Sequence, residues 1–303
     1  IESMTQITLL DGSIGQELVK RASGPATPLW STSVMMEQPE LVGQVHADYF
    51  AAGATIATTN SYAVHFNRLE RVGIADQQAA LTTVAVDQAV AARDAHGSGR
   101  IAGALGPMLA SYRPDLLPDV GLARERFAQK ITMLGARVDF LLAETVCSLQ
   151  EAEGIFQGYA ASGSTKPLWI SFSVDDTDGT KLRSGEPLMV VSQMMAHYGP
   201  AAVLLNCSMP EAITQGLPIL TDCGLPFGAY ANGFTMITDD FKKDAPTVDS
   251  LSARQDLTPQ KYADHVMNWV GAGATIVGGC CEVGPAHIAE IARRLRAAGH
   301  TLV

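Results

Sequence analysis

Two adjacent cysteines near one end of the sequence are its clearest indication of chemistry. Cys280 and Cys281 follow Gly278-Gly279 at the end of an apolar run. Adjacent side chains on a regular strand point to opposite faces, so both thiols can reach one ion only where the backbone bends, which glycine permits. A third cysteine, Cys207, follows another apolar run. We therefore predict that Cys207, Cys280 and Cys281 converge on one metal ion.

Three sulfur ligands around one ion suggest a particular metal and a particular reaction. Three thiolates with a fourth position left open are typical of a catalytic zinc site, and soft sulfur ligands favour zinc or copper(I) over magnesium or calcium. The open position suits a substrate thiol, which becomes a nucleophilic thiolate when it coordinates the metal. We predict attack of that sulfur on an activated methyl group. The alternative is that these cysteines are merely buried, as we expect for Cys147 and Cys223.

Polar side chains follow several other apolar runs, where they could bind an amino-acid substrate. Asp11 and Glu144 could accept hydrogen bonds from its ammonium group. The backbone N–H groups of Gly12 and Ser13, at the start of a helix, could bind its carboxylate. The alternatives are a simple turn at Asp11-Gly12 and a helix cap at Glu144. The other polar candidates at strand ends are Thr59, Asn60, Asn206 and Asn232.

Aromatic side chains near the same strand ends could bind a cationic methyl donor. A sulfonium or quaternary ammonium group is attracted to an aromatic face by about 0.5–2 kcal/mol. Trp30 and Tyr62 are the first candidates, and Tyr230 and Tyr112 lie near other strand ends. Packing is the alternative role for each of these rings.

An alternation of short apolar runs and longer amphipathic stretches positions these residues. Near-continuous apolar runs are typical of buried parallel strands, and the stretches between them have the three- and four-residue spacing of helices. Eight strands and eight helices predict a single (β/α)8 barrel over residues 1–303, because a closed barrel brings all the strand ends together. A doubly wound open sheet is the alternative. The predicted strands span residues 7–12, 54–60, 101–106, 140–145, 168–174, 202–208, 227–232 and 275–280.

Composition restricts the class of function. The 303 residues carry a formal net charge of -10, which argues against nucleic acid or an anionic membrane as a partner. No apolar run is long enough to span a bilayer, and the first residues do not resemble a signal peptide. Five cysteines, two of them adjacent, make a disulfide framework unexpected. We expect a cytoplasmic enzyme acting on small molecules, with long loops at 19–36 and 233–257 above its catalytic face.

The motifs together resemble the homocysteine S-methyltransferase family. That family includes betaine-homocysteine methyltransferase, S-methylmethionine-dependent enzymes and the homocysteine domain of cobalamin-dependent methionine synthase. The resemblance runs from about Leu9 to about Ala298. The motifs that carry it are LLDGSIGQEL (9–18), PELVGQVHADYFAAGATIATTNSY (39–62), GALGP (103–107), ET (144–145), SGEPL (184–188), NCS (206–208) and GGCC (278–281).

The resemblance implies zinc held by the three cysteines, homocysteine bound near Asp11 and Glu144, and transfer of a methyl group to its thiol to give methionine. Thr145 stands where betaine-type members tend to carry an aromatic residue, and Trp30 in PLWS is similar to S-methylmethionine-type members. The implied donor is therefore a sulfonium, S-methylmethionine or S-adenosylmethionine. The alternative is a homocysteine-binding zinc subunit that takes its methyl group from betaine or from a separate methyl-corrinoid carrier protein. The segment YANGF (230–234) departs from the family pattern.

Overall fold

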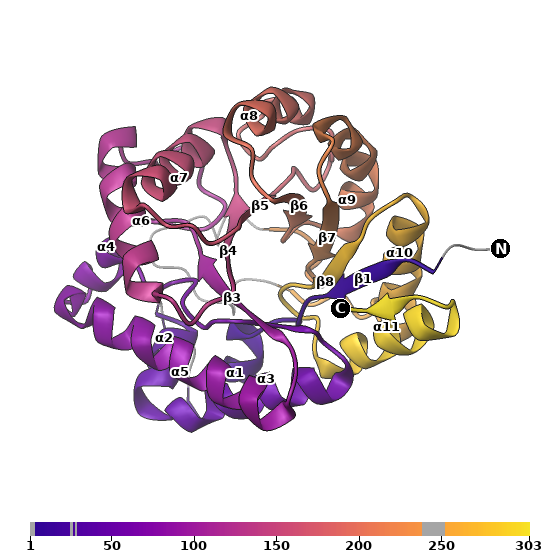
Figure 1. Cartoon of the computed structure of the whole chain (residues 1–303), viewed down its shortest axis with the longest axis horizontal. Helices are drawn as coiled ribbons and strands as arrows, with labels where there is room; N and C mark the ends of the chain where they lie inside the picture. Colours follow the sequence, from indigo (N-terminus) through magenta and orange to yellow (C-terminus); the bar gives the residue numbers. More distant parts are fainter. Residues whose placement is uncertain (1–3, 25–26, 28, 238–251) are drawn as a thin grey trace.

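A ring of parallel strands surrounded by helices forms the body of the molecule (Figure 1). The computed structural model describes residues 4–24, 27, 29–237 and 252–303. Within them the strand order is β2-β3-β4-β5-β6-β7-β8-β1-β9, and every ladder is parallel. The (β/α)8 barrel predicted from the sequence is confirmed. The strands are β1 (Gln6–Leu9), β2 (Ile56–Thr58), β3 (Arg100–Leu105), β4 (Phe140–Val146), β5 (Leu168–Phe172), β6 (Ala202–Asn206), β7 (Phe227–Ala231), β8 (Ile276–Gly279) and β9 (Thr301–Leu302).

The ring closes between β1 and β2 through single hydrogen bonds and not through a ladder. The Thr55 N–H donates to the Leu9 carbonyl over 2.8 Å. Towards the carboxyl ends of the same strands, the N–H and hydroxyl of Thr58 both donate to the Asp11 carboxylate, at 2.7 and 2.9 Å. Asp11 therefore helps to close the barrel as well as facing its catalytic end.

Helices cover the outer face of the ring between successive strands (Figure 1). Their starting points follow the local capping signals: the Ser148 hydroxyl accepts from the Glu151 N–H, and the Thr258 hydroxyl accepts from the Lys261 N–H. The helices are α1 (Gly15–Arg21), α2 (Ser31–Glu37), α3 (Pro39–Ala52), α4 (Phe66–Glu70), α5 (Gln78–His96), α6 (Val120–Leu134), α7 (Leu149–Ser162), α8 (Val191–Tyr198), α9 (Pro210–Gly216), α10 (Pro259–Gly271) and α11 (Pro285–Ala297), with 3-10 turns η1 (Ala75–Gln77), η2 (Leu188–Val190) and η3 (Leu217–Cys223).

Two predicted loops differ from the structure. The segment 19–36 is not a continuous loop, because it holds the end of α1 and most of α2, whose Met35 packs into the core. Residues 238–251 of the predicted loop 233–257 lie outside the described residues. At its described ends, Phe234 and Ala253 form an antiparallel bridge.

Two apolar layers fix the barrel. One lies between the strands and the helices, and the other fills the barrel interior. At the amino-terminal end of the strands, Phe140 and Trp169 stack with ring centroids 4.0 Å apart, and the Arg100 guanidinium covers both rings. This packing fills the end of the barrel opposite the site. None of the described helices is long and apolar enough to cross a membrane.

Candidate metal and substrate site

A cavity of about 100 Å³ lies at the carboxyl ends of the strands, where active sites of (β/α)8 barrels form. Its walls contain every residue that the sequence predicted for the site except Asn232. The cavity is mostly apolar, with polar groups at a few positions, as small-molecule sites are. Lining residues that were not predicted from the sequence include Ile14, Gln16, Ser31 and Ser111.

The three predicted metal ligands meet on one wall of this cavity. The sulfur atoms of Cys207, Cys280 and Cys281 all lie within 4.8 Å of one another. Strand pairing brings them together, because the Cys207 N–H donates to the carbonyl of Tyr230 on β7 and the Cys280 N–H donates to that of Ala231. Three converging sulfur atoms fit a soft metal ion such as zinc once all three are reduced thiolates.

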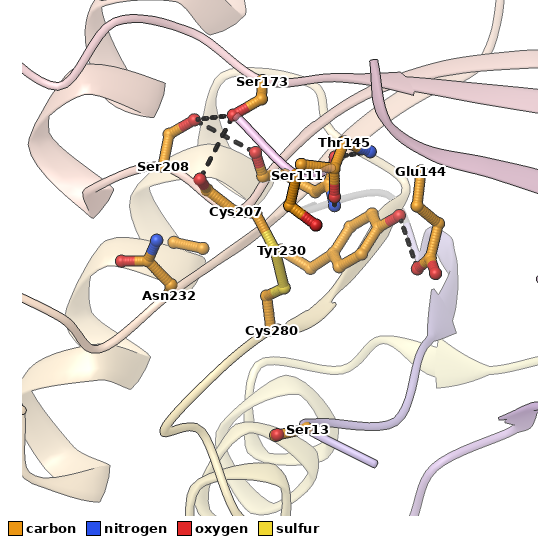
Figure 2. The surroundings of a disulfide bond; sticks show 12 residues. Ser13, Ser111, Glu144, Thr145, Ser173, Cys207, Ser208, Tyr230, Asn232 and Cys280 are labelled. Carbon is orange, nitrogen blue, oxygen red and sulfur yellow. Dashed lines mark hydrogen bonds between the residues drawn. A yellow bond between two sulfur atoms is a disulfide. The ribbon is translucent and has the colours of Figure 1, made fainter. Parts of the chain in front are cut away.

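Two of these cysteines are joined in the structure, which the sequence analysis did not expect. Cys207 and Cys280 form a disulfide (Figure 2), whereas Cys281 is free. The odd number of cysteines argues against a framework of several disulfides. It does not exclude a single disulfide between two cysteines that neighbouring strand ends bring together. A disulfide and a three-thiolate metal site use the same sulfur atoms, so each state excludes the other.

The glycines before the cysteine pair are required by close packing. A Cβ atom at Gly278 would lie 2.5 Å from the Cβ of Leu10, and one at Gly279 would overlap the side chain of Val283. The bend itself falls later, at Glu282, where φ is +64°. The glycines are thus needed for close packing, while the positive backbone angle belongs to Glu282, a residue with a side chain.

A buried ion pair fixes the backbone at Cys207. Arg183 donates to the Cys207 carbonyl over 3.0 Å and to the Ser173 hydroxyl over 2.7 Å. Its guanidinium pairs with Asp176 at 3.3 Å and lies 4.8 Å from the ring centroid of Tyr112. Arg183 was not among the predicted site residues, although it directly precedes the SGEPL motif. The arrangement holds Cys207 in a left-handed turn, at a φ of +47°.

Two carboxyl groups, Asp11 and the half-buried Glu144, line the cavity from other strands. Burial raises the pKa of Asp11 to about 7, although the hydrogen bonds from Thr58 lower it. Burial also raises the pKa of Glu144 to about 8, against the opposing effect of a hydrogen bond from the Tyr230 hydroxyl at 3.0 Å (Figure 2). Both groups therefore change charge near neutral pH. The hydroxyl of Tyr230 is bonded to Glu144, and the role predicted for its ring in binding the methyl donor stays a prediction.

The first βα turn carries Gly12 and Ser13, whose N–H groups were predicted to bind a substrate carboxylate. The Ser13 N–H donates to the Val283 carbonyl over 2.9 Å in this structure, and the carboxylate role stays a prediction. Gly12 is required there, because a Cβ atom would overlap the same carbonyl and lie 2.9 Å from the Tyr49 hydroxyl. The Tyr49 hydroxyl in turn donates to the Ser13 carbonyl over 2.6 Å.

The predicted amides hold the rim of the cavity together. The Asn206 carbonyl oxygen accepts from the Thr145 N–H at 3.0 Å and from the Ser171 hydroxyl at 2.8 Å. Asn60 donates to the Ser31 carbonyl, and the Thr59 hydroxyl accepts from the Ala104 N–H. These side chains line the cavity but are largely occupied by the protein itself.

Asn232 lies beyond the cavity wall. Its side-chain carbonyl oxygen accepts from the Phe234 N–H at 3.3 Å, and its backbone N–H donates to the Ser208 carbonyl at 3.1 Å. Figure 2 places it on the far side of Cys207 from Glu144. In this position Asn232 supports the turn after β7.

Unusual backbone angles are concentrated around the cavity. Among the described residues, five non-glycine residues have positive φ. Four of them line the cavity, and the fifth, Glu282, directly follows Cys281. Non-glycine residues in this conformation are strained and occur preferentially at functional sites. The five are Trp30, Tyr112, Thr145, Cys207 and Glu282.

Comparison with known proteins assigns the chain to a family. A homocysteine S-methyltransferase family model matches residues 8–295. The chain belongs to the homocysteine S-methyltransferase family. Two similar members are the homocysteine S-methyltransferase of Escherichia coli, 31% identical over 95% of both chains, and homocysteine S-methyltransferase YbgG of Bacillus subtilis, 29% identical over 94% of this chain and 93% of its own.

Solved structures of a homocysteine methyltransferase share the fold of this family member. The metallated form of the homocysteine methyltransferase MmuM from Escherichia coli superposes with a TM-score of 0.80 and 30% identity, covering 96% of each chain. The oxidised form of the same protein also gives 0.80, covering 95% of this chain and 96% of that one.

Proposed function

We propose that this protein transfers a methyl group from a sulfonium donor, S-methylmethionine or S-adenosylmethionine, to the thiol of L-homocysteine, giving methionine. The observation that carries the proposal is the convergence of three cysteine sulfur atoms within 4.8 Å at the wall of the cavity. Membership of the homocysteine S-methyltransferase family supports the same reaction.

Cys207, Cys280 and Cys281 would hold zinc once the disulfide is reduced. When bound, zinc supplies a Lewis acid that lowers the pKa of a substrate thiol. A reducing compartment such as the cytoplasm would keep the three thiols available. Arg183 keeps the Cys207 backbone in place for this role through its hydrogen bond to the carbonyl.

The carboxyl groups of Asp11 and Glu144 would bind the homocysteine ammonium. Both line the cavity, Asp11 buried and Glu144 half-buried, and in their ionised forms both accept hydrogen bonds. The positive charge of the ammonium favours those ionised forms, which lowers both pKa values when the substrate binds. Substrate binding and carboxyl ionisation would therefore be coupled.

Trp30 and Tyr62 would bind the donor sulfonium through their aromatic faces. Tyr62 is oriented by the hydrogen bond between its hydroxyl and that of Ser111, at 2.8 Å. The acceptor sulfur, as a thiolate whose proton has passed to solvent, forms a bond to the methyl carbon while the bond from that carbon to the donor sulfur breaks. The electron pair of the broken bond stays on the donor sulfur, which leaves as a neutral thioether.

Donor profiling tests the proposal. Reduced, zinc-loaded protein is incubated with homocysteine and one donor at a time, and methionine is measured, with Cys207→Ala as the control that should form none. Methionine from a sulfonium donor is the expected result. Turnover only with betaine or a methyl-corrinoid would overturn the donor assignment. Homocysteine binding without turnover on any free donor would indicate the carrier-dependent alternative.

A further inference from the structure

Gln16 occupies an unusual position on α1, in the wall of the cavity. Its side chain is 8% exposed, and its backbone N–H donates to the Ser13 hydroxyl over 3.1 Å, which fixes the residue in the first turn of the helix. The side-chain carbonyl oxygen is buried and has no hydrogen-bond partner among the described residues. Such unpaired buried acceptors are rare and destabilising.

The partner of the other end of this amide determines its orientation. The Gln16 side-chain nitrogen donates to one Glu282 oxygen over 2.8 Å, and the Lys20 ammonium donates to the second over 2.7 Å. Both Glu282 oxygens therefore accept hydrogen bonds. Rotating the amide would place the Gln16 oxygen against a carboxylate oxygen, with no hydrogen between them. The carbonyl oxygen must remain the unpaired end.

The chemistry of that oxygen defines the ligand it can bind. A carbonyl oxygen only accepts hydrogen bonds, so it binds an N–H or O–H group and not a substrate carboxylate. In homocysteine and S-methylmethionine the strong N–H donor is the α-ammonium group, which has three N–H donors. Two amino-acid substrates would bring two ammonium groups to the cavity. Thr58 and Tyr230 already donate to Asp11 and Glu144, which leaves these carboxylates fewer free acceptor positions for those groups.

We propose that Gln16 is a further substrate-binding residue, whose side-chain carbonyl accepts a hydrogen bond from the α-ammonium group of an amino-acid substrate. The inference rests on the proposed function, since it assumes amino-acid substrates. Glu282 acts as a positioning residue for Gln16. Because Glu282 directly follows Cys281, one residue connects the orientation of the amide to the loop that carries two of the sulfur ligands.

The ammonium can come from the thiol acceptor or from the sulfonium donor, and matched ligand pairs separate the two. The acceptor pair is homocysteine and 4-sulfanylbutanoate, which lacks the amino group. The donor pair is S-methylmethionine and 4-(dimethylsulfonio)butanoate, which differs in the same way. Calorimetry on the reduced, zinc-loaded protein gives a Kd for each ligand. Within a pair, the Kd of the ligand without the amino group divided by the Kd of the ligand with it measures recognition of the ammonium.

Gln16→Leu removes the acceptor while keeping a good helix former of similar size, and Gln16→Met is a second variant of the same kind. Lys20→Met is the matched control, since it removes the other partner of Glu282 and leaves the Gln16 carbonyl intact. We expect Gln16→Leu to reduce the ratio in one pair by roughly 10- to 100-fold, the usual range for a hydrogen bond to a charged group. Lys20→Met should leave both ratios unchanged.

The outcomes separate this inference from the proposed function. A reduced ratio in the acceptor pair alone identifies the homocysteine ammonium as the ligand, and one in the donor pair alone identifies the donor ammonium. Unchanged ratios in both pairs with both Gln16 variants would overturn the inference, as would an equal loss in Lys20→Met. Homocysteine that binds but gives no methionine refutes the proposed function, and the binding ratios still test Gln16.

Discussion

The ionisation of Glu144 gives the sharpest test of how the cavity binds homocysteine. Its pKa is raised to about 8 by burial. A proton therefore binds to this carboxyl as the pH falls through 8, and the negative charge that would attract an ammonium is lost. We expect kcat/KM for homocysteine to fall with decreasing pH, because this constant reports the ionisation of the free enzyme.

The size of the effect follows from the pKa. A carboxyl with a pKa of about 8 is half ionised at pH 8 and about 1% ionised at pH 6, so Glu144 alone predicts a decrease of about 50-fold over that interval. Asp11, with a pKa of about 7, steepens the decrease below pH 7. Glu144→Gln should lower kcat/KM at pH 8.5 by roughly 10- to 100-fold, the value of a hydrogen bond between charged groups. It should also lose the part of the decrease that begins at pH 8.

Initial rates of methionine formation, with homocysteine below its KM and the donor saturating, measure the profile between pH 6 and 9. Tyr230→Phe is the diagnostic variant. Its hydroxyl lowers the Glu144 pKa, so removing it should move the decrease to higher pH. A Glu144→Gln profile that matches the wild type, or a shift to lower pH in Tyr230→Phe, would refute the assignment of Glu144 to the ammonium.

Three further predictions follow from the site and its first turn. Protein in which Cys207 and Cys280 are oxidised should bind no zinc, and reduction should restore about one zinc per chain. Metal analysis before and after treatment with a thiol reductant checks this, and an equal zinc content in the two samples would contradict it. Arg183→Ala should weaken zinc binding by roughly tenfold or more, the usual effect of losing an outer-shell partner, as measured by competition with a chelator, while Arg183→Lys should recover part of it. Gly12→Ala should lower the free energy of unfolding by about 1–3 kcal/mol through overpacking against Val283, which chemical denaturation measures.

Strand positions were predictable because each strand is a short apolar run bounded by turn residues. All eight predicted runs overlap the barrel strands, and β2, β5 and β6 are buried along their whole length, as parallel strands are. The ninth strand, β9, was missed because it has two residues and no pattern of its own. Its pairing with β1 depends on where the preceding helix returns the chain.

The site was predictable to the extent that barrel strands share one catalytic end. That rule alone places Asp11, Glu144 and the three cysteines on one cavity. It does not reveal which polar groups have partners within the protein, such as the Ser13 N–H, which donates to the Val283 carbonyl. It also cannot find Gln16 or Arg183, whose roles depend on partners 266 and 24 residues away in the sequence.

The left-handed residues around the cavity have a consequence for protein engineering. Glycine would relieve backbone strain at positions such as Tyr112, Thr145 and Glu282, so a search for heat-resistant variants would favour it there. Each replacement would also remove the side chain that the strained turn directs toward its neighbours. A thermostability screen for this barrel therefore needs a parallel turnover assay, because the replacements it favours change side chains at or beside the cavity.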